Sequence, residues 1–157
     1  MSFEVKDITY TIGILLTFAV GVWSLTVGLR NTRKTNFINT VTSQRVKWIE
    51  QLRQDIGSLC GLTHTWFYSS LEGTDKEHDV LKEIDRLRHV IPLRLNQNAT
   101  LDRKIRALIT NLPKLTHETK QHQLDAALSD LIGLSQQLLK EEWEKVKLEA
   151  VKGDLKA

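Results

Sequence analysis

The sequence predicts an all-α protein in which one N-terminal transmembrane helix continues into a cytoplasmic helical bundle. Three observations support this fold class. Residues 8–29 contain no charged side chain, and the chain has only two prolines, Pro92 and Pro113. The rest of the chain repeats apolar residues every three or four positions, which is typical of helices with one buried face.

The uncharged segment is long enough to cross a bilayer. Its 22 residues rise about 33 Å as an α-helix, against a hydrocarbon core of about 30 Å. A spanning segment must be helical, because lipid offers no partner for free backbone amides. A cleavable signal peptide is disfavoured, since residues 1–7 sum to a charge of −1 and no small-residue cleavage motif follows. A buried helix of a soluble protein is rarely so long and uncharged.

The charges on either side of the span predict its orientation. One lysine precedes it together with Glu4 and Asp7, whereas residues 30–53 carry six basic side chains against Glu50 alone. Positive flanks stay in the cytoplasm. We therefore expect a single-pass protein of the inner (cytoplasmic) membrane, with residues 1–7 outside and residues 30–157 in the cytoplasm. The single Cys60 agrees, because one cysteine cannot form an intramolecular disulfide.

The membrane helix is expected to continue into the cytoplasm as far as about Leu71. Neither glycine nor proline interrupts residues 30–56, and Gly57 and Gly61 are expected to permit close helix packing rather than to end the helix. The apolar series of this helix starts at Phe37 and continues with Val41, Trp48, Leu52, Ile56, Leu59, Thr63 and Trp66.

Three more helices are expected after Gly73. Residues 74–77 match a capping box at the start of the second helix, which we expect to end at Pro92. The third is expected over about residues 100–112 and the fourth over about 117–152. Their apolar positions at helical spacing are Val80, Ile84, Leu87 and Ile91, then Leu101, Ile105, Leu108 and Leu112, then Leu124, Leu128, Leu131, Leu138 and Val146. These faces are sufficient for one bundle with its own core.

Three local sequence patterns carry a family resemblance: RVKWIEQLR at 45–53, IPLRLNQN at 91–98 and LSQQLLKEEWEKVKLEA at 134–150. Together they resemble segments of a loose family of small bacterial membrane proteins with one N-terminal span and a helical cytoplasmic domain. Some of these resemble antiphage-defence membrane effectors, most narrowly the Hailong type, which is paired with a nucleotidyltransferase. The family's middle motif usually reads like LLNPNEDEH, but this chain has NQNAT at 96–100. A role of the family's acidic residues therefore does not carry over, and the resemblance implies no particular chemistry.

Catalytic and metal-binding motifs are missing from the sequence. The five histidines (His64, His78, His89, His117 and His122) match no zinc-binding spacing. There is no nucleophile elbow, phosphate-binding glycine loop or dinucleotide fingerprint. We expect no enzymatic activity and no cofactor.

A basic segment lies in the middle of the cytoplasmic part. Between Arg86 and Lys120 there are eight basic residues against Asp102 and Glu118, a local charge of +6. Such a segment beside a loop of amide side chains can hold phosphates and read base edges. A solvated surface, or one attracted to anionic lipid heads, is the commoner use of this pattern. The candidate residues for an anionic ligand are Arg86, Arg88, Arg94, Asn96, Arg103, Lys104 and Arg106.

Small residues form a stripe along the span. They follow each other at intervals of four, four, three and four, which keeps them on one helix face: Gly13, Thr17, Gly21, Ser24 and Gly28. Small residues let helix backbones approach closely within a membrane. We therefore expect this face to mediate self-association or to line a pore, although glycine and threonine are also common in ordinary spans.

Two functions of different classes fit the sequence. The first is a homo-oligomeric membrane effector, pore-forming or membrane-disrupting and acting in antiphage defence. Its cytoplasmic domain would respond to a nucleotide, an oligonucleotide or a partner protein of the same operon. The second is a membrane-tethered adaptor that recruits a cytoplasmic protein to the bilayer. Oligomeric state separates them, because one span per chain cannot form a pore alone.

Overall fold

The computed structural model describes residues 5–69, 71 and 73–152, and over these residues it is helical without any strand. The predicted all-α class is confirmed. Residues 1–4 of the expected outer segment and residues 153–157 of the expected cytoplasmic part lie outside the described residues. In chain order the helices are α1 (Val5–Tyr68), α2 (Asp75–Arg94), α3 (Thr100–Asn111), the short 3-10 helices η1 (Leu112–Lys114) and η2 (Glu118–Lys120), and α4 (Gln121–Lys152).

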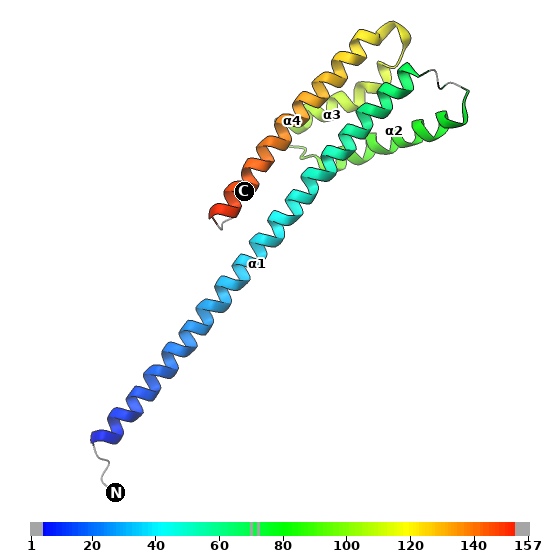
Figure 1. Ribbon diagram of the computed structural model, residues 1–157. Helices are drawn as coiled ribbons and strands as arrows, with labels where there is room; N and C mark the ends of the chain where they lie inside the picture. Colours follow the sequence, from blue (N-terminus) through cyan, green and yellow to red (C-terminus); the bar gives the residue numbers. More distant parts are fainter. Residues whose placement is uncertain (1–4, 70, 72, 153–157) are drawn as a thin grey trace.

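Helix α1 is one continuous rod of 64 residues, which corresponds to about 96 Å at 1.5 Å per residue. Its first half extends alone, and the other helices lie along its second half (Figure 1). The apolar side chains between Ile12 and Leu29 are exposed. Among the described helices α1 alone is long and apolar enough to cross a membrane, and its apolar window is not buried against any other part of the chain. An exposed apolar surface of this size is typical of a segment that contacts a partner or a membrane.

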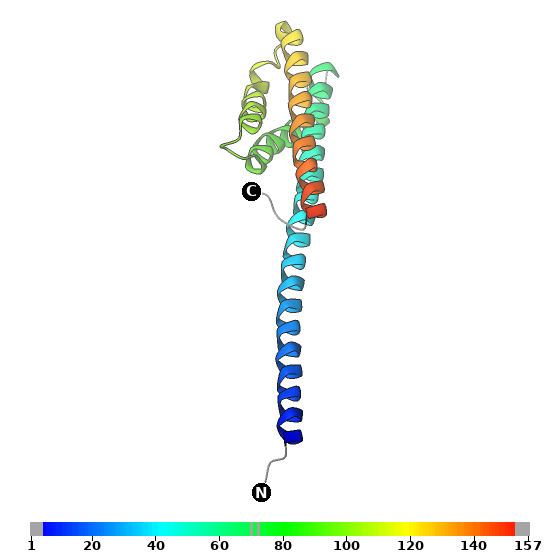
Figure 2. The same ribbon diagram turned by 90° about the vertical axis from the view of Figure 1, so that its left-hand side faces the viewer.

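The packed part of the molecule, residues 38–152, is here called the helical head. Ile38 is the first buried residue of α1 along the chain. Helix α4 runs back along α1 toward the apolar segment, and α2 packs on α1 while α3 packs on α4 (Figure 2). This path places the beginning of α1's packed segment next to the end of α4.

The core of the helical head is built from the apolar faces that the sequence predicts. Leu52 and Leu59 of α1, Leu87 of α2 and Leu131 of α4 are at most 1% exposed. In α3 the buried apolar residues are Ile105 and Ile109, followed by Leu112 at the start of η1, while Leu101 and Leu108 are only partly buried. The prediction for α3 omitted Ile109, because both faces of this short helix carry leucine or isoleucine at helical spacing.

The second helix begins differently from the capping box that the sequence predicts. The Thr74 hydroxyl donates to the Leu71 carbonyl at 2.7 Å instead of to the helix. The Glu77 carboxylate accepts the backbone N–H of Gly73 at 2.8 Å, one residue before the expected donor. Gly73 has φ +75°, a conformation that glycine adopts without steric cost. This turn directs the Gly73 amide back to Glu77.

Several other local expectations require correction. Helix α1 ends at Tyr68 rather than at Leu71, and α2 continues past Pro92 to Arg94. A proline in the last turn removes one N–H donor but leaves its carbonyl, which accepts from the Leu95 N–H. Gly57 and Gly61 do not end the helix, as expected, but within this chain neither is closely packed, since an added Cβ would meet no atom within 4 Å at either residue.

Candidate functional site

A groove of about 840 Å³ lies on the helical head between α1, α3 and α4, and is here called the α1–α4 groove. Val41 and Trp48 line it from α1, Lys104 from α3, and Glu142 and Lys145 from α4. Its volume falls within the range of ligand pockets, about 300–1,000 Å³. Val41 follows the last residue of the uncharged segment by twelve positions, a rise of about 18 Å along a helix. The groove therefore lies at the end of the head that faces the apolar segment of α1.

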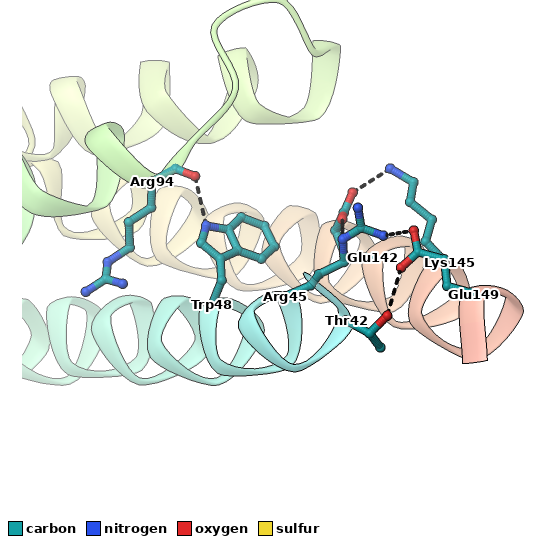
Figure 3. A network of polar contacts seen from close by, with 7 residues as sticks. All are labelled: Thr42, Arg45, Trp48, Arg94, Glu142, Lys145 and Glu149. Carbon is teal, nitrogen blue, oxygen red and sulfur yellow. Dashed lines mark hydrogen bonds and ion pairs between the residues drawn. The ribbon is translucent and has the colours of Figure 1, made fainter. Parts of the chain in front are cut away.

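An ion network joins α1 to α4 beside this groove (Figure 3). Glu149 is buried, with 1% of its surface exposed, and it forms an ion pair with Arg45. The Thr42 hydroxyl lies 3.5 Å from the Glu149 Oε2. Arg45 Nε is also 3.7 Å from the Glu142 Oε2, and Lys145 Nζ is 2.5 Å from the Glu142 Oε1. Arg45 thus contacts two carboxylates that lie two turns apart on α4.

Arg94, the last residue of α2, contacts α1 through both its backbone carbonyl and its side chain. Trp48 Nε1 donates to the Arg94 carbonyl at 3.0 Å. The Arg94 side chain extends away from the tryptophan (Figure 3). Its Nε lies 2.9 Å from the Asp55 Oδ2, and its Nη1 donates to the Gln51 Oε1 at 2.6 Å. The charge of Arg94 is therefore balanced inside the protein.

Asn96, which the sequence proposes as a base-reading residue, helps to form a turn. Its side-chain oxygen accepts the Asn98 N–H at 3.0 Å, and its own N–H donates to the Asp102 Oδ1 at 2.7 Å. Asp102 is 4% exposed, so this hydrogen bond satisfies a buried carboxylate. Asparagine commonly closes turns in this way. A role in ligand binding would have to use the amide nitrogen.

The structure brings only part of the predicted basic set together. Arg94, Asn96 and Lys104 line the α1–α4 groove. The other members lie elsewhere: Arg86, Arg88, Arg103 and Arg106.

Three of those other arginines have partners of their own. Arg86 binds Glu83 through Nε at 2.8 Å and Nη2 at 2.7 Å. This pair lowers the pKa of Glu83 and raises the pKa of Arg86, mainly through the shared hydrogen bonds. Arg106 Nη2 donates to the Pro92 carbonyl at 2.8 Å and so joins α3 to α2. Arg88 Nη1 donates to the Asp85 Oδ1 at 3.3 Å.

Two groove cations were missed by the sequence reasoning. Arg45 and Lys145 come from α1 and α4 and reach the groove only through the tertiary fold. The RVKWIEQLR and LSQQLLKEEWEKVKLEA segments contain them, but no local pattern indicates that they meet. In total, the lining holds four basic residues (Arg45, Arg94, Lys104 and Lys145) and three acidic ones (Asp102, Glu141 and Glu142).

The chemistry of the groove follows from this balance. Within the described part of the chain, Lys104 is the lining cation for which the structure shows no ion pair. An entering anion would find Lys104 available and would compete with Glu142 for Arg45 and Lys145. Such charge-assisted contacts are the strong hydrogen bonds of proteins.

The small-residue stripe of the apolar segment is uncovered in the single chain. Thr17 donates its hydroxyl back to the Gly13 carbonyl at 2.8 Å, and Gly13, Gly21 and Gly28 have space for a Cβ. Ser24 is exposed on the same helix. No other described helix reaches this face (Figures 1 and 2).

Nucleophilic and metal chemistry find little support in the described residues. They contain no group of three or more His, Cys, Asp and Glu that could hold a metal ion. Burial raises the pKa of Cys60 to about 11, so the side chain is a thiol at neutral pH. No protein family, curated protein or solved structure matches the chain.

Proposed function

We propose that the protein is a homo-oligomeric membrane effector whose helical head controls the state of its span. Its output is a pore or another disruption of the membrane, in the setting of antiphage defence. The observation that carries this proposal is the continuity of α1, which runs as one helix from the apolar segment into the head. A rotation or shift of its packed half would move the span directly. A simple tether needs no such rigid connection.

The proposed input is an anionic ligand, a nucleotide or oligonucleotide, in the α1–α4 groove, or a partner protein that acts on the same contacts. Glu142 is shared between Arg45 and Lys145, so a phosphate could replace it at both cations. This exchange would weaken the hold of α4 on α1 at the end nearest the span. The assembly would then have two states that differ in ligand affinity, which is the requirement for a ligand-driven switch.

The proposed topology places the head in the cytoplasm and the N-terminus outside, in the inner membrane. The charge difference across the span supports this orientation. A reporter enzyme fused to the C-terminus should be active only if it works in the cytoplasm. Activity of a periplasm-specific reporter there would contradict the topology.

The ligand proposal is tested with full-length protein in neutral-lipid nanodiscs and a fluorescently labelled hexadeoxyadenylate. Binding should weaken as salt rises, because bound counterions are released. Lys104→Gln and Lys145→Gln should each reduce affinity by about tenfold, the scale of one lost charge-assisted hydrogen bond. Glu142→Gln should tighten binding, because it removes the competing carboxylate. Arg86→Gln is the matched control, since Arg86 lies outside the groove.

Two results would contradict the proposal. Lack of binding at low salt would exclude the oligonucleotide as ligand, and an unchanged affinity in Glu142→Gln would exclude the exchange of partners. The adaptor alternative makes a separate forecast. It permits a monomer that leaves dye-loaded vesicles intact, whereas the effector must be oligomeric and must release the dye.

A further inference from the structure

A second hollow lies at the end of the helical head that is farther from the span. It encloses about 300 Å³ between α1, α2 and η1, and is here called the distal pocket. Its α1 wall includes Trp66, eighteen positions beyond Trp48 of the α1–α4 groove. That spacing is a rise of about 27 Å along the helix, so the two sites are separate.

The walls of the distal pocket are mainly apolar. Trp66 and Ile84 are partly buried, Leu112 is buried, and Pro113 closes one side. Small-molecule sites usually combine apolar walls with a few polar groups that fix the ligand's orientation. The distal pocket has this composition, since Thr63, Asp85 and Arg88 also line it.

Thr63 is the first of its unusual polar groups. The residue is 2% exposed, and within the described part of the chain its buried hydroxyl has no hydrogen-bond partner. By contrast, the hydroxyls of Thr17 and Thr40 on the same helix each donate to the carbonyl four residues earlier at 2.8 Å. A buried hydroxyl without a partner is unfavourable. An acceptor on a ligand that reached this hydroxyl would satisfy it.

Arg88 supplies the second polar group. Its Nε is buried and lacks a hydrogen-bond partner among the described residues, while Nη1 is held by the Asp85 Oδ1 at 3.3 Å. Thus two buried donors, one of them on a cationic side chain, lack an acceptor on residues that line the same pocket.

We propose that the distal pocket binds a small monocarboxylate with an apolar body, such as an aryl or short alkyl carboxylate. The carboxylate accepts the Nε–H of Arg88 and the hydroxyl of Thr63, and the apolar body packs against Trp66, Ile84 and Leu112. The volume is at the lower end of ligand pockets, about 300 Å³, which fits such a molecule and not a nucleotide. This site is independent of the proposed gating by the α1–α4 groove.

The test uses full-length protein in nanodiscs and two probes of nearly the same shape, 3-phenylpropionate and the neutral 3-phenyl-1-propanol. Isothermal titration calorimetry, corrected with empty nanodiscs, measures binding. The carboxylate should bind saturably, and the alcohol should bind at least about tenfold more weakly because a neutral hydroxyl is a weaker acceptor for the Arg88 Nε–H than a carboxylate. Lack of saturable carboxylate binding, or equal binding of the two probes, would overturn the proposal.

Two variants test the residues themselves. Thr63→Val keeps the side-chain shape and removes the hydroxyl, while Arg88→Met keeps the apolar stem and removes the guanidinium. Each should weaken carboxylate binding by about tenfold, and Thr63→Val should unfold no earlier than the parent on heating, because it removes a buried hydroxyl without a partner. Arg86→Met, on the exposed side of the same helix, should bind normally. Parent affinity in either Thr63→Val or Arg88→Met would refute the assignment.

Discussion

Replacing Arg45 with methionine should release the end of α4 nearest the span. Glu149 has a fully buried side chain, and Arg45 is its charged partner. The Thr42 hydroxyl, 3.5 Å away, cannot replace that charge. Breaking a buried ion pair by removing one partner costs about 3–5 kcal/mol. We expect about 3 kcal/mol here, because the Arg45 side chain is 24% exposed and solvent already screens part of its charge.

The opposite deletion should cost less. In Glu149→Gln, Arg45 retains Glu142 at 3.7 Å and partial access to water, so we expect a loss of about 1–2 kcal/mol. The double variant Arg45→Met with Glu149→Leu removes both charges and leaves an apolar contact. It should be more stable than Arg45→Met alone. Two independent losses would instead make the double variant the least stable of the three.

Hydrogen exchange measured by mass spectrometry on the full-length protein in nanodiscs distinguishes these outcomes. A local loss of about 3 kcal/mol corresponds to about 150-fold faster exchange in the last turns of α4. A peptide from α3 provides the reference, because no described residue of α3 forms a hydrogen bond or ion pair with this network. The reasoning is refuted if Arg45→Met exchanges no faster than Glu149→Gln, or if the double variant exchanges fastest.

Three further predictions concern other parts of the molecule. Burial raises the pKa of Cys60 from 9.0 to about 11, so alkylation by iodoacetamide near neutral pH should be about 100-fold slower than for an exposed thiol. Because the pKa of Cys60 is higher in the folded protein than in the unfolded chain, the free energy of unfolding should fall as pH rises from 9 to 11. Cys60→Ala should abolish this fall, which chemical unfolding at several pH values measures. Trp48→Phe removes the hydrogen bond to the Arg94 carbonyl and should lower the unfolding free energy by about 1 kcal/mol, and an unchanged denaturant midpoint would contradict this. Gly21→Leu and Gly28→Leu should reduce oligomer size in light scattering without preventing membrane insertion, if the small-residue face mediates association; parent-sized oligomers in both would exclude that face.

The buried faces of the helices were largely predictable because helical periodicity is a local property. Leu52, Leu87 and Leu131 repeat with apolar neighbours at three- and four-residue spacing, and all three are buried. Helix ends were less predictable. A capping box at Thr74 and an end at Pro92 are both reasonable from sequence, but the observed bonds involve Gly73 and Leu95 instead. Hydrogen bonds at a helix end depend on the path that the chain takes in the turn next to it.

The charged residues show the limit of local reasoning most clearly. The segment from Arg86 to Lys120 has a local charge of +6, which by itself predicts one continuous basic surface. In the structure Arg86 turns to Glu83, whereas Arg94 turns to Asp55 on α1. Charge density along the chain does not predict charge density in space, because each long side chain finds its partner only after the helices pack.

The sequence by itself determined the helical class, the apolar segment able to cross a membrane and the faces that form the core. Each of these depends on composition or on the 3.6-residue period, and both are properties of neighbouring residues. Only the tertiary structure decided that Arg45 meets Glu149, that Lys104 and Lys145 share a groove, and that Thr63 and Arg88 line one pocket. These residues lie far apart along the chain, so their meeting depends on how α2 and α4 pack against α1.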